Sequence, residues 1–214
     1  VVGGMVSPPA NPLVMSQPSL RFNDIDNVGI TGRHYSTHFH LGQHAFQSPE
    51  NYDKEKYLSD IITWLTDGVK LPLNEIQFHE DQWGGGGNLG VSLEYFSRGV
   101  ELGNQVYMTY KITPKGYKDL DIKVLDMGSG QERYPWITSG KPINFELTMP
   151  DAVKYLYRRS GRKPDMELWK KFVPVSGNLN VDEVDNIEKM WTSTAKKIGY
   201  SKDKLKNEIY PISS

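Results

Sequence analysis

Hydrophobic and polar residues alternate along much of the first two thirds of the chain. This alternation predicts β-strands, because successive side chains of a strand point to opposite faces of a sheet. The exception is a helix predicted over residues 52–69, where Tyr57, Ile61 and Leu65 follow helical spacing. The predicted strands cover residues 13–17, 19–22, 33–46, 74–80, 91–95, 106–112 and 122–125.

The pattern becomes helical after Met149. Pro150 suits the first turn of a helix, where no amide hydrogen is needed, and Asp151 suits the positive end of the helix dipole. We therefore expect an α+β fold, in which a mostly antiparallel sheet flanked by helices precedes a helical segment. Its boundary is placed between residues 139 and 150, and further helices are predicted over residues 165–172, 181–199 and 201–208.

Composition narrows the class of protein. The 214 residues are 24% charged and 37% hydrophobic, which is typical of a globular protein. The absence of cysteine excludes disulfides and thiolate zinc sites. No apolar run has the length of a membrane span, and residues 1–13 lack the basic start and apolar core of a signal peptide. We therefore expect a cytoplasmic protein with no membrane partner.

Charge is unevenly distributed along the chain. Residues 1–150 carry 12 Lys/Arg and 17 Asp/Glu, a net charge of −5, whereas residues 151–214 carry 13 and 9, a net charge of +4. A basic C-terminal part permits contact with nucleic acid. A solvated helical surface explains it equally well, so charge alone leaves both interpretations open.

The most informative stretch runs from Leu125 to Arg133 and reads LDMGSGQER. Its glycines allow the backbone to approach a ligand closely. Arg133 suits a phosphate, and Asp126 suits a cationic group such as an amine. These residue types fit a ligand with both charges, as an amino acid beside a nucleotide has. They also fit a strand that ends in a glycine turn with a surface ion pair.

Four of the five histidines are separated by even numbers of residues, so they would share one face of a strand: His34, His38, His40 and His44. Neutral imidazoles bind transition metals, so a metal site is one hypothesis. Structural zinc sites usually add thiolates or carboxylates, and the H-E-x-x-H motif is absent. We therefore favour imidazoles that line a polar pocket, and we expect no metal.

Two further segments contain candidates for a pocket. Trp83 precedes four consecutive glycines and is placed to wall a small apolar pocket, with a glycine loop predicted over residues 84–90. No dinucleotide-binding or phosphate-loop motif occurs. Asn104 stands at the head of an apolar strand, where asparagine is disfavoured. It is either an edge residue, the interpretation favoured in isolation, or a hydrogen-bonding group at a pocket.

Taken in order, these segments resemble archaeal-type alanyl-tRNA synthetases, a family of class II aminoacyl-tRNA synthetases. The resemblance covers residues 1–140 well and the helical remainder loosely, and it implies the class II antiparallel sheet. The four matching segments are PANPLVMSQPSLRFNDIDNVGITGRH around motif 2, QWGGGGNLG in a tryptophan and glycine-rich loop, ELGNQVYMTY in an alanine-contacting strand, and LDMGSGQER in motif 3.

The resemblance implies an ATP site. Arg21 matches the motif 2 arginine, which holds the α-phosphate of ATP and the substrate carboxylate. Arg133 matches the motif 3 arginine on the γ-phosphate, and both arginines are thereby implied to be catalytic. His40 takes the position beside the adenine, and Gly130 is implied to line the same site. The loop over residues 23–32 lies where class II enzymes contact ATP and the tRNA acceptor end.

The resemblance also implies an alanine site. Asp126 matches the acidic residue that pairs with the alanine ammonium group. Trp83, Asn104 and Gly128 match residues that line the alanine pocket. The implied activity is the formation of alanyl-adenylate from alanine and ATP with Mg²⁺, followed by transfer to the acceptor stem of tRNA(Ala).

The implied organisation is a catalytic core over residues 1–145 that lacks motif 1, and a helical tRNA-recognition segment over residues 146–214. The missing remainder of the same enzyme is a further expected partner. One departure concerns the Phe-Glu-Met that usually follows the motif 2 hairpin, because this chain has His38, Phe39 and His40 there. The missing Glu favours an alternative, a synthetase-like fragment that binds tRNA without catalysis.

Overall fold

A computed structural model describes residues 1–3 and 5–213 and divides the chain into two units. Unit 1 comprises Val1–Pro18 and Phe39–Thr138, and unit 2 comprises Ser19–His38 and Ser139–Ser214. The helical unit thus takes in an early stretch of chain in addition to the C-terminal segment. The roles assigned to residues 1–145 and 146–214 remain predictions.

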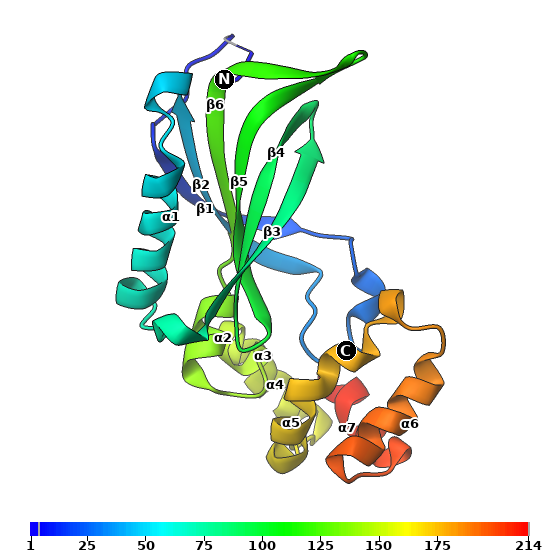
Figure 1. The fold of residues 1–214 in the computed structure, drawn as a ribbon. Coiled ribbons are helices and arrows are strands. Elements are labelled where there is room, and N and C mark those ends of the chain that lie inside the picture. Colours follow the sequence, from blue (N-terminus) through cyan, green and yellow to red (C-terminus); the bar gives the residue numbers. More distant parts are fainter. Residues whose placement is uncertain (4, 214) are drawn as a thin grey trace. The chain divides into compact units, whose positions relative to one another are not determined.

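Unit 1 is built on a six-stranded sheet with the order β1-β2-β6-β5-β4-β3 (Figure 1). The pairs β2–β6, β3–β4, β4–β5 and β5–β6 are antiparallel, which confirms the predicted sheet type. The strands are β1 (Leu13–Leu20), β2 (Thr37–Gln47), β3 (Ile76–Gly85), β4 (Asn88–Ser97), β5 (Val100–Thr113) and β6 (Gly116–Gly130).

Four strands, β3 to β6, are longer than the sequence pattern predicts. β6 continues through Gly130, so the prediction of a strand followed by a glycine turn at this point is wrong. The prediction of a loop over residues 84–90 is also wrong, because only Gly86 and Gly87 separate β3 from β4. Both have positive φ angles, +58° and +80°, as a tight two-residue hairpin turn requires.

Gly90 lies where β4 passes very close to β5. A Cβ atom at this position would lie 2.6 Å from the Tyr107 carbonyl carbon and 2.8 Å from Met108 Cα. Backbone atoms inside a sheet have little freedom to move, so Gly90→Ala is expected to cost about 3 kcal/mol of the free energy of unfolding. Denaturant titration would measure it. Gly84→Ala is the matched control, because its Cβ would meet its nearest neighbour at 3.6 Å; an equal loss in both variants would contradict the argument.

Helix α1 (Lys54–Thr63) covers one face of the sheet (Figure 1), and its first turn is capped by the Asp53 side chain. The helix continues as a π-helical turn through Trp64–Gly68, which agrees with the predicted helix. Two buried clusters join this helical segment and α2 (Arg133–Ser139) to the sheet. Their buried members are Ile61, Leu65, Leu71, Tyr95, Leu102, Tyr134 and Ile137, and Ala45, Tyr57, Tyr107 and Leu125.

Unit 2 is helical and has its own core, centred on the fully buried Trp169, Phe172 and Trp191. The predicted helix at Pro150 is confirmed. The helix predicted from residue 181 begins instead at Ile187, because Asn186 caps it by accepting a hydrogen bond from the Lys189 amide. The helices are α3 (Phe145–Thr148), α4 (Pro150–Ser160), α5 (Met166–Phe172), α6 (Ile187–Ile198) and α7 (Lys202–Ser213).

The early segment of unit 2, Ser19–His38, is hydrogen-bonded to the C-terminal part of the unit through Asn27, which is fully buried. Its side chain donates to Asn180 Oδ1 at 2.8 Å and accepts from the Val181 amide at 2.8 Å. Gly32 lies against Trp169, since a Cβ atom there would meet the indole ring at 2.7 Å. Across residues 1–3 and 5–213, no helix is both long and apolar enough to span a membrane.

Candidate functional site

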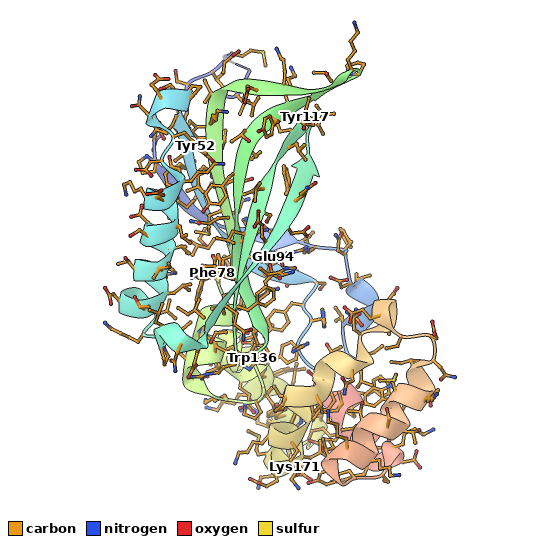
Figure 2. The ribbon with its side chains drawn as sticks, viewed as in Figure 1. Tyr52, Phe78, Glu94, Tyr117, Trp136 and Lys171 are labelled. Carbon is orange, nitrogen blue, oxygen red and sulfur yellow. The ribbon has the colours of Figure 1, made fainter. Side chains whose placement is uncertain are left out.

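The face of the sheet away from α1, called the polar face below, gathers most of the residues singled out in the sequence. Alternation along β6 places Asp126, Gly128 and Gly130 on it, opposite to the buried Leu125. The register pairs Gly128 with Asn104 of β5, and Asn104 in turn with Glu94 of β4. Figure 2 shows Glu94 and Phe78 on opposite sides of the sheet.

Asn104 lies in the middle of the sheet, because β5 pairs with β4 on one side and β6 on the other. Its interpretation as an edge residue is therefore wrong. Gly128 brings Asn104 close to a histidine, since a Cβ at Gly128 would lie 2.9 Å from His40 Cε1 and 3.6 Å from Asn104 Oδ1. Glycine at this position thus keeps the space between the imidazole and the amide free.

Asp126 faces His44 across the β2–β6 pair, where the two residues are register partners. His44 Nδ1 lies 3.0 Å from Asp126 Oδ1, and the side chains are 27% and 30% exposed. The hydrogen bond to Asp126 raises the pKa of His44, and partial burial of the imidazole opposes that rise. The carboxylate therefore has a hydrogen-bonding partner on one oxygen and remains accessible to solvent.

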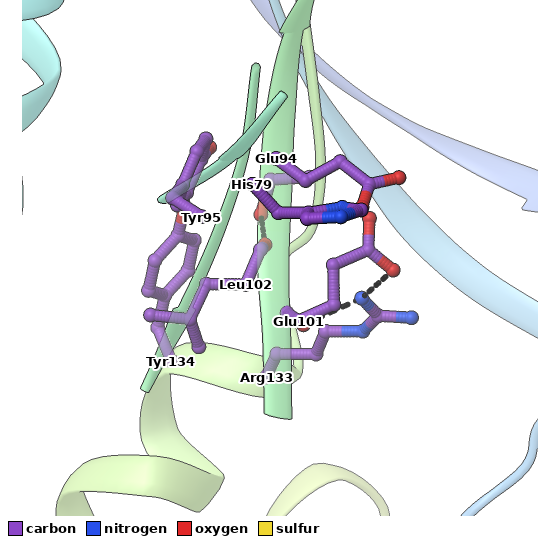
Figure 3. Close-up of polar contacts among 8 residues, drawn as sticks. His79, Glu94, Tyr95, Glu101, Leu102, Arg133 and Tyr134 are labelled. Atoms are coloured by element: carbon purple, nitrogen blue, oxygen red, sulfur yellow. Dashed lines mark hydrogen bonds and ion pairs between the residues drawn. The ribbon is translucent and has the colours of Figure 1, made fainter. Parts of the chain in front are cut away.

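A bulge in β5 places Glu101 on the polar face. The register pairs Tyr95 with Gly103 but Phe96 with Glu101, so Leu102 turns into the core beside α1. Arg133 Nη1 donates to the Glu101 carbonyl at 2.5 Å and to its carboxylate at 3.1 Å. Figure 3 shows this pair on the side of β5 opposite to Leu102.

Trp83 lies at the β3 edge of the polar face, as the register partner of Gly90. Its indole lies over Gly85, where a Cβ atom would meet the ring at 2.7 Å. Gly130 lies beside Arg133, and a Cβ there would make an ordinary contact of 3.5 Å with the arginine Nε. Gly85 thus makes space for the indole ring on the same face.

Arg21 is the one predicted site residue that lies in unit 2. Its backbone amide donates to the Ser36 carbonyl at 3.0 Å, which closes the chain segment between β1 and β2. The other seven predicted site residues, His40, Trp83, Asn104, Asp126, Gly128, Gly130 and Arg133, all belong to unit 1.

The expectation that four histidines share one strand face is wrong for His34, because β2 begins at Thr37. The His34 imidazole instead hydrogen-bonds Thr31 through Nδ1. His40 and His44 do share the polar face. Within the described part of the chain, no three or more His, Cys, Asp or Glu side chains are grouped as metal ligands would be.

Sequence reasoning missed two residues of this face. The even spacing of His40 and His44 was a signal for His44, but its partner Asp126 is more than eighty residues away along the chain. No sequence pattern indicated Glu101, because the β-bulge that turns its side chain to the polar face has no signature in the sequence.

Comparison with known proteins identifies the family. The family model described as tRNA synthetases class II (A) matches residues 1–210. The alanine–tRNA ligase of Methanocella arvoryzae is 46% identical over 99% of this chain and 25% of the relative. The corresponding proteins of Halobacterium salinarum and Methanothermobacter thermautotrophicus are 37% and 36% identical over 99% and 100% of this chain and 25% and 24% of the relatives.

The chain spans about a quarter of the length of these relatives. Among solved structures, the pyrrolysyl-tRNA synthetase of Desulfitobacterium hafniense aligns with a TM-score of 0.37 and 14% identity, over 54% of this chain and 39% of that chain. That similarity is too low to carry a structural argument. The family match and the sequence relatives confirm the resemblance to archaeal-type alanyl-tRNA synthetases, and the chain belongs to the class II tRNA synthetases.

Proposed function

We propose that the full-length protein activates alanine with ATP and transfers the alanyl group to tRNA(Ala). The observation that carries the proposal is the polar face, where β5, β6 and α2 bring Asn104, Asp126, Gly128 and Arg133 onto one surface of unit 1. The sequence relatives, which are alanine–tRNA ligases, support the same substrate.

The proposed first step is a displacement at phosphorus. A carboxylate oxygen of alanine attacks the α-phosphorus of ATP, the bond to the bridging oxygen breaks, and pyrophosphate leaves with the Mg²⁺ that accompanies ATP. Such transfers depend on positioning and on stabilisation of charge more than on a protein base. The 2′- or 3′-hydroxyl of the tRNA terminus then attacks the carbonyl carbon, and AMP leaves.

The residues of unit 1 supply two kinds of contact in this proposal. Asp126 binds the alanine ammonium group, while Asn104 and Gly128 line the space around the small side chain. Trp83 is proposed to line the same pocket, although β4 and β5 separate its strand from β6 in the sheet. Arg133 binds the γ-phosphate, and Gly130, which lies beside the arginine side chain, lines the same site. Glu101 holds Arg133 in place through two acceptors, so the cation is oriented before ATP binds.

Two assignments concern the remainder of the ATP site. Arg21 is proposed to bind the α-phosphate and the alanine carboxylate, as the motif 2 arginine does. His40 is proposed to lie beside the adenine. Its ring lies near Gly128, and this proximity supports a position at the border of the two proposed subsites.

The experiment for this proposal is ATP–pyrophosphate exchange by the full-length protein with each of the twenty amino acids. We expect alanine to give the highest kcat/KM, with weaker exchange for glycine and serine. A pocket for a methyl group discriminates by only about 1–3 kcal/mol against a missing methylene or an added hydroxyl. Exchange that prefers a different amino acid would refute the assignment of alanine.

The alternative is a non-catalytic synthetase-like protein that binds the acceptor stem of tRNA. The specific observation in its favour is Phe39 at the position where the family carries Glu, together with the net charge of +4 over residues 151–214. It predicts no exchange with any amino acid, and binding of acceptor-stem RNA that weakens steeply as salt is added. The exchange assay therefore separates the two proposals.

A further inference from the structure

His44 contacts the carboxylate of Asp126, and the proposed function gives it no role. The contact joins His44 Nδ1 to Asp126 Oδ1 over 3.0 Å. An ionised carboxylate only accepts hydrogen bonds, so Nδ1 carries the proton and donates it. This fixes the tautomer of the neutral imidazole and holds one carboxylate oxygen in place.

Among the described residues of the two strands beside β2, Asp126 is the one ionisable side chain in register with this imidazole on the polar face. Along β2, the ring lies over Gly42, where a Cβ atom would come within 3.0 Å of His44 Nε2. On β6, the residues that flank Asp126 on the same face are Val124 and Gly128. β1, the other neighbour of β2, contains no ionisable side chain. The nearest ionisable residue of β2 itself on this face is His40, beyond Gly42.

Neutral and protonated imidazole act differently on this carboxylate. A neutral His44 donates one hydrogen bond and leaves the full negative charge of Asp126, with its second oxygen, for a substrate ammonium group. A protonated His44 forms an ion pair with the same carboxylate and offsets that charge. We propose that His44 is a positioning residue for the amino-acid substrate, which orients Asp126 when neutral and competes with the substrate ammonium group when protonated.

The inference rests on the proposed function, because it takes the ligand of Asp126 to be an amino acid. The inference also predicts in which direction the affinity for alanine changes with pH. The pKa of His44 is raised by its hydrogen bond to Asp126, so protonation begins at a higher pH than for an ordinary histidine. Affinity for alanine should therefore fall as pH decreases through that pKa, and affinity for ATP should not follow it.

The test is ATP–pyrophosphate exchange by the full-length protein between pH about 5 and 8, with KM measured separately for alanine and for ATP. His44→Asn keeps a donor near the Nδ1 position but cannot be protonated, so its KM for alanine should be independent of pH. His44→Ala loses the donor, and its KM for alanine should rise about tenfold at pH 8. Thermal unfolding of each variant reports whether it is folded.

His79→Asn is the matched control. His79 also pairs with a carboxylate on this side of the sheet, through Nδ1 at 3.3 Å from Glu94 Oε2 (Figure 3). Its side chain is 70% exposed, and β4 and β5 separate its strand from the β6 strand of Asp126. This variant should retain the pH profile of the wild type, which would show that loss of the profile is specific to His44.

A second measurement needs no variant. If protonation of His44 weakens alanine binding, then by linkage alanine must lower the pKa of His44. Histidine NMR titration of the wild type with and without alanine should show this shift. Wild-type exchange with an alanine KM that is independent of pH, or a His44 pKa that alanine leaves unchanged, would overturn the inference and leave the proposed function standing. Absence of exchange by the wild type at every pH would remove both.

Discussion

Replacing Arg133 with alanine is expected to lower kcat/KM for ATP in alanine-dependent exchange by at least a hundredfold, or about 3 kcal/mol of transition-state stabilisation. The guanidinium is held by the carbonyl and the carboxylate of Glu101, and no rearrangement is needed to orient it. Fixed charge of this kind is most effective where negative charge develops on the leaving pyrophosphate. Steady-state exchange kinetics with saturating alanine measures the effect.

The stability of this variant should change little. Arg133 and Glu101 are 37% and 38% exposed, and ion pairs of this exposure contribute less than about 1 kcal/mol to the free energy of unfolding. A loss of activity with a nearly unchanged melting temperature would therefore assign Arg133 to substrate binding. A large fall in melting temperature would instead indicate a structural role.

Arg98 provides the matched control within unit 1. Like Arg133, it donates to one carboxylate and one backbone carbonyl, Glu75 at 2.7 Å and Ile137 at 3.1 Å. Arg98→Ala should keep exchange activity, because no residue of the proposed site contacts this pair. If Arg98→Ala and Arg133→Ala lost activity equally, the proposed role of Arg133 would be refuted.

Local pattern predicted the sheet and most helices, because alternation and helical spacing reflect which side chains are buried. It did not predict that strands β3 and β6 continue through their glycines. Gly85 and Gly128 lie inside strands, where a Cβ atom would collide with Trp83 and His40 respectively. The advantage of glycine there depends on neighbours in space, so a glycine in a strand looks like a turn when only the sequence is considered.

The candidate site could be predicted residue by residue but not as a set of contacts. Asp126 and Arg133 were indicated by their chemistry beside the glycines of one short stretch. The partners that fix them, His44 and Glu101, depend on the β2–β6 register and on a bulge in β5. Both arise from long-range pairing, for which one sequence without relatives gives no signal.

Replacing Asp126 with asparagine is expected to raise KM for alanine about a hundredfold, or about 3 kcal/mol, and to leave KM for ATP unchanged. The amide has the shape of the carboxylate and still accepts a hydrogen bond from His44, but it has no charge for the alanine ammonium group. Exchange kinetics with each substrate varied in turn would separate the two KM values. Equal increases in both would contradict an alanine-specific role.

Asp119→Asn on the same strand is the control, because Asp119 pairs with Lys123 at 3.0 Å and is 75% exposed. In the Asp126→Asn variant, the charge and the charge-assisted hydrogen bond that raise the pKa of His44 are both lost, while the burial that lowers it remains. The pKa of His44 should therefore fall in this variant and stay raised in Asp119→Asn. Histidine NMR titration measures that shift without substrate, so it tests the His44–Asp126 contact independently of any activity.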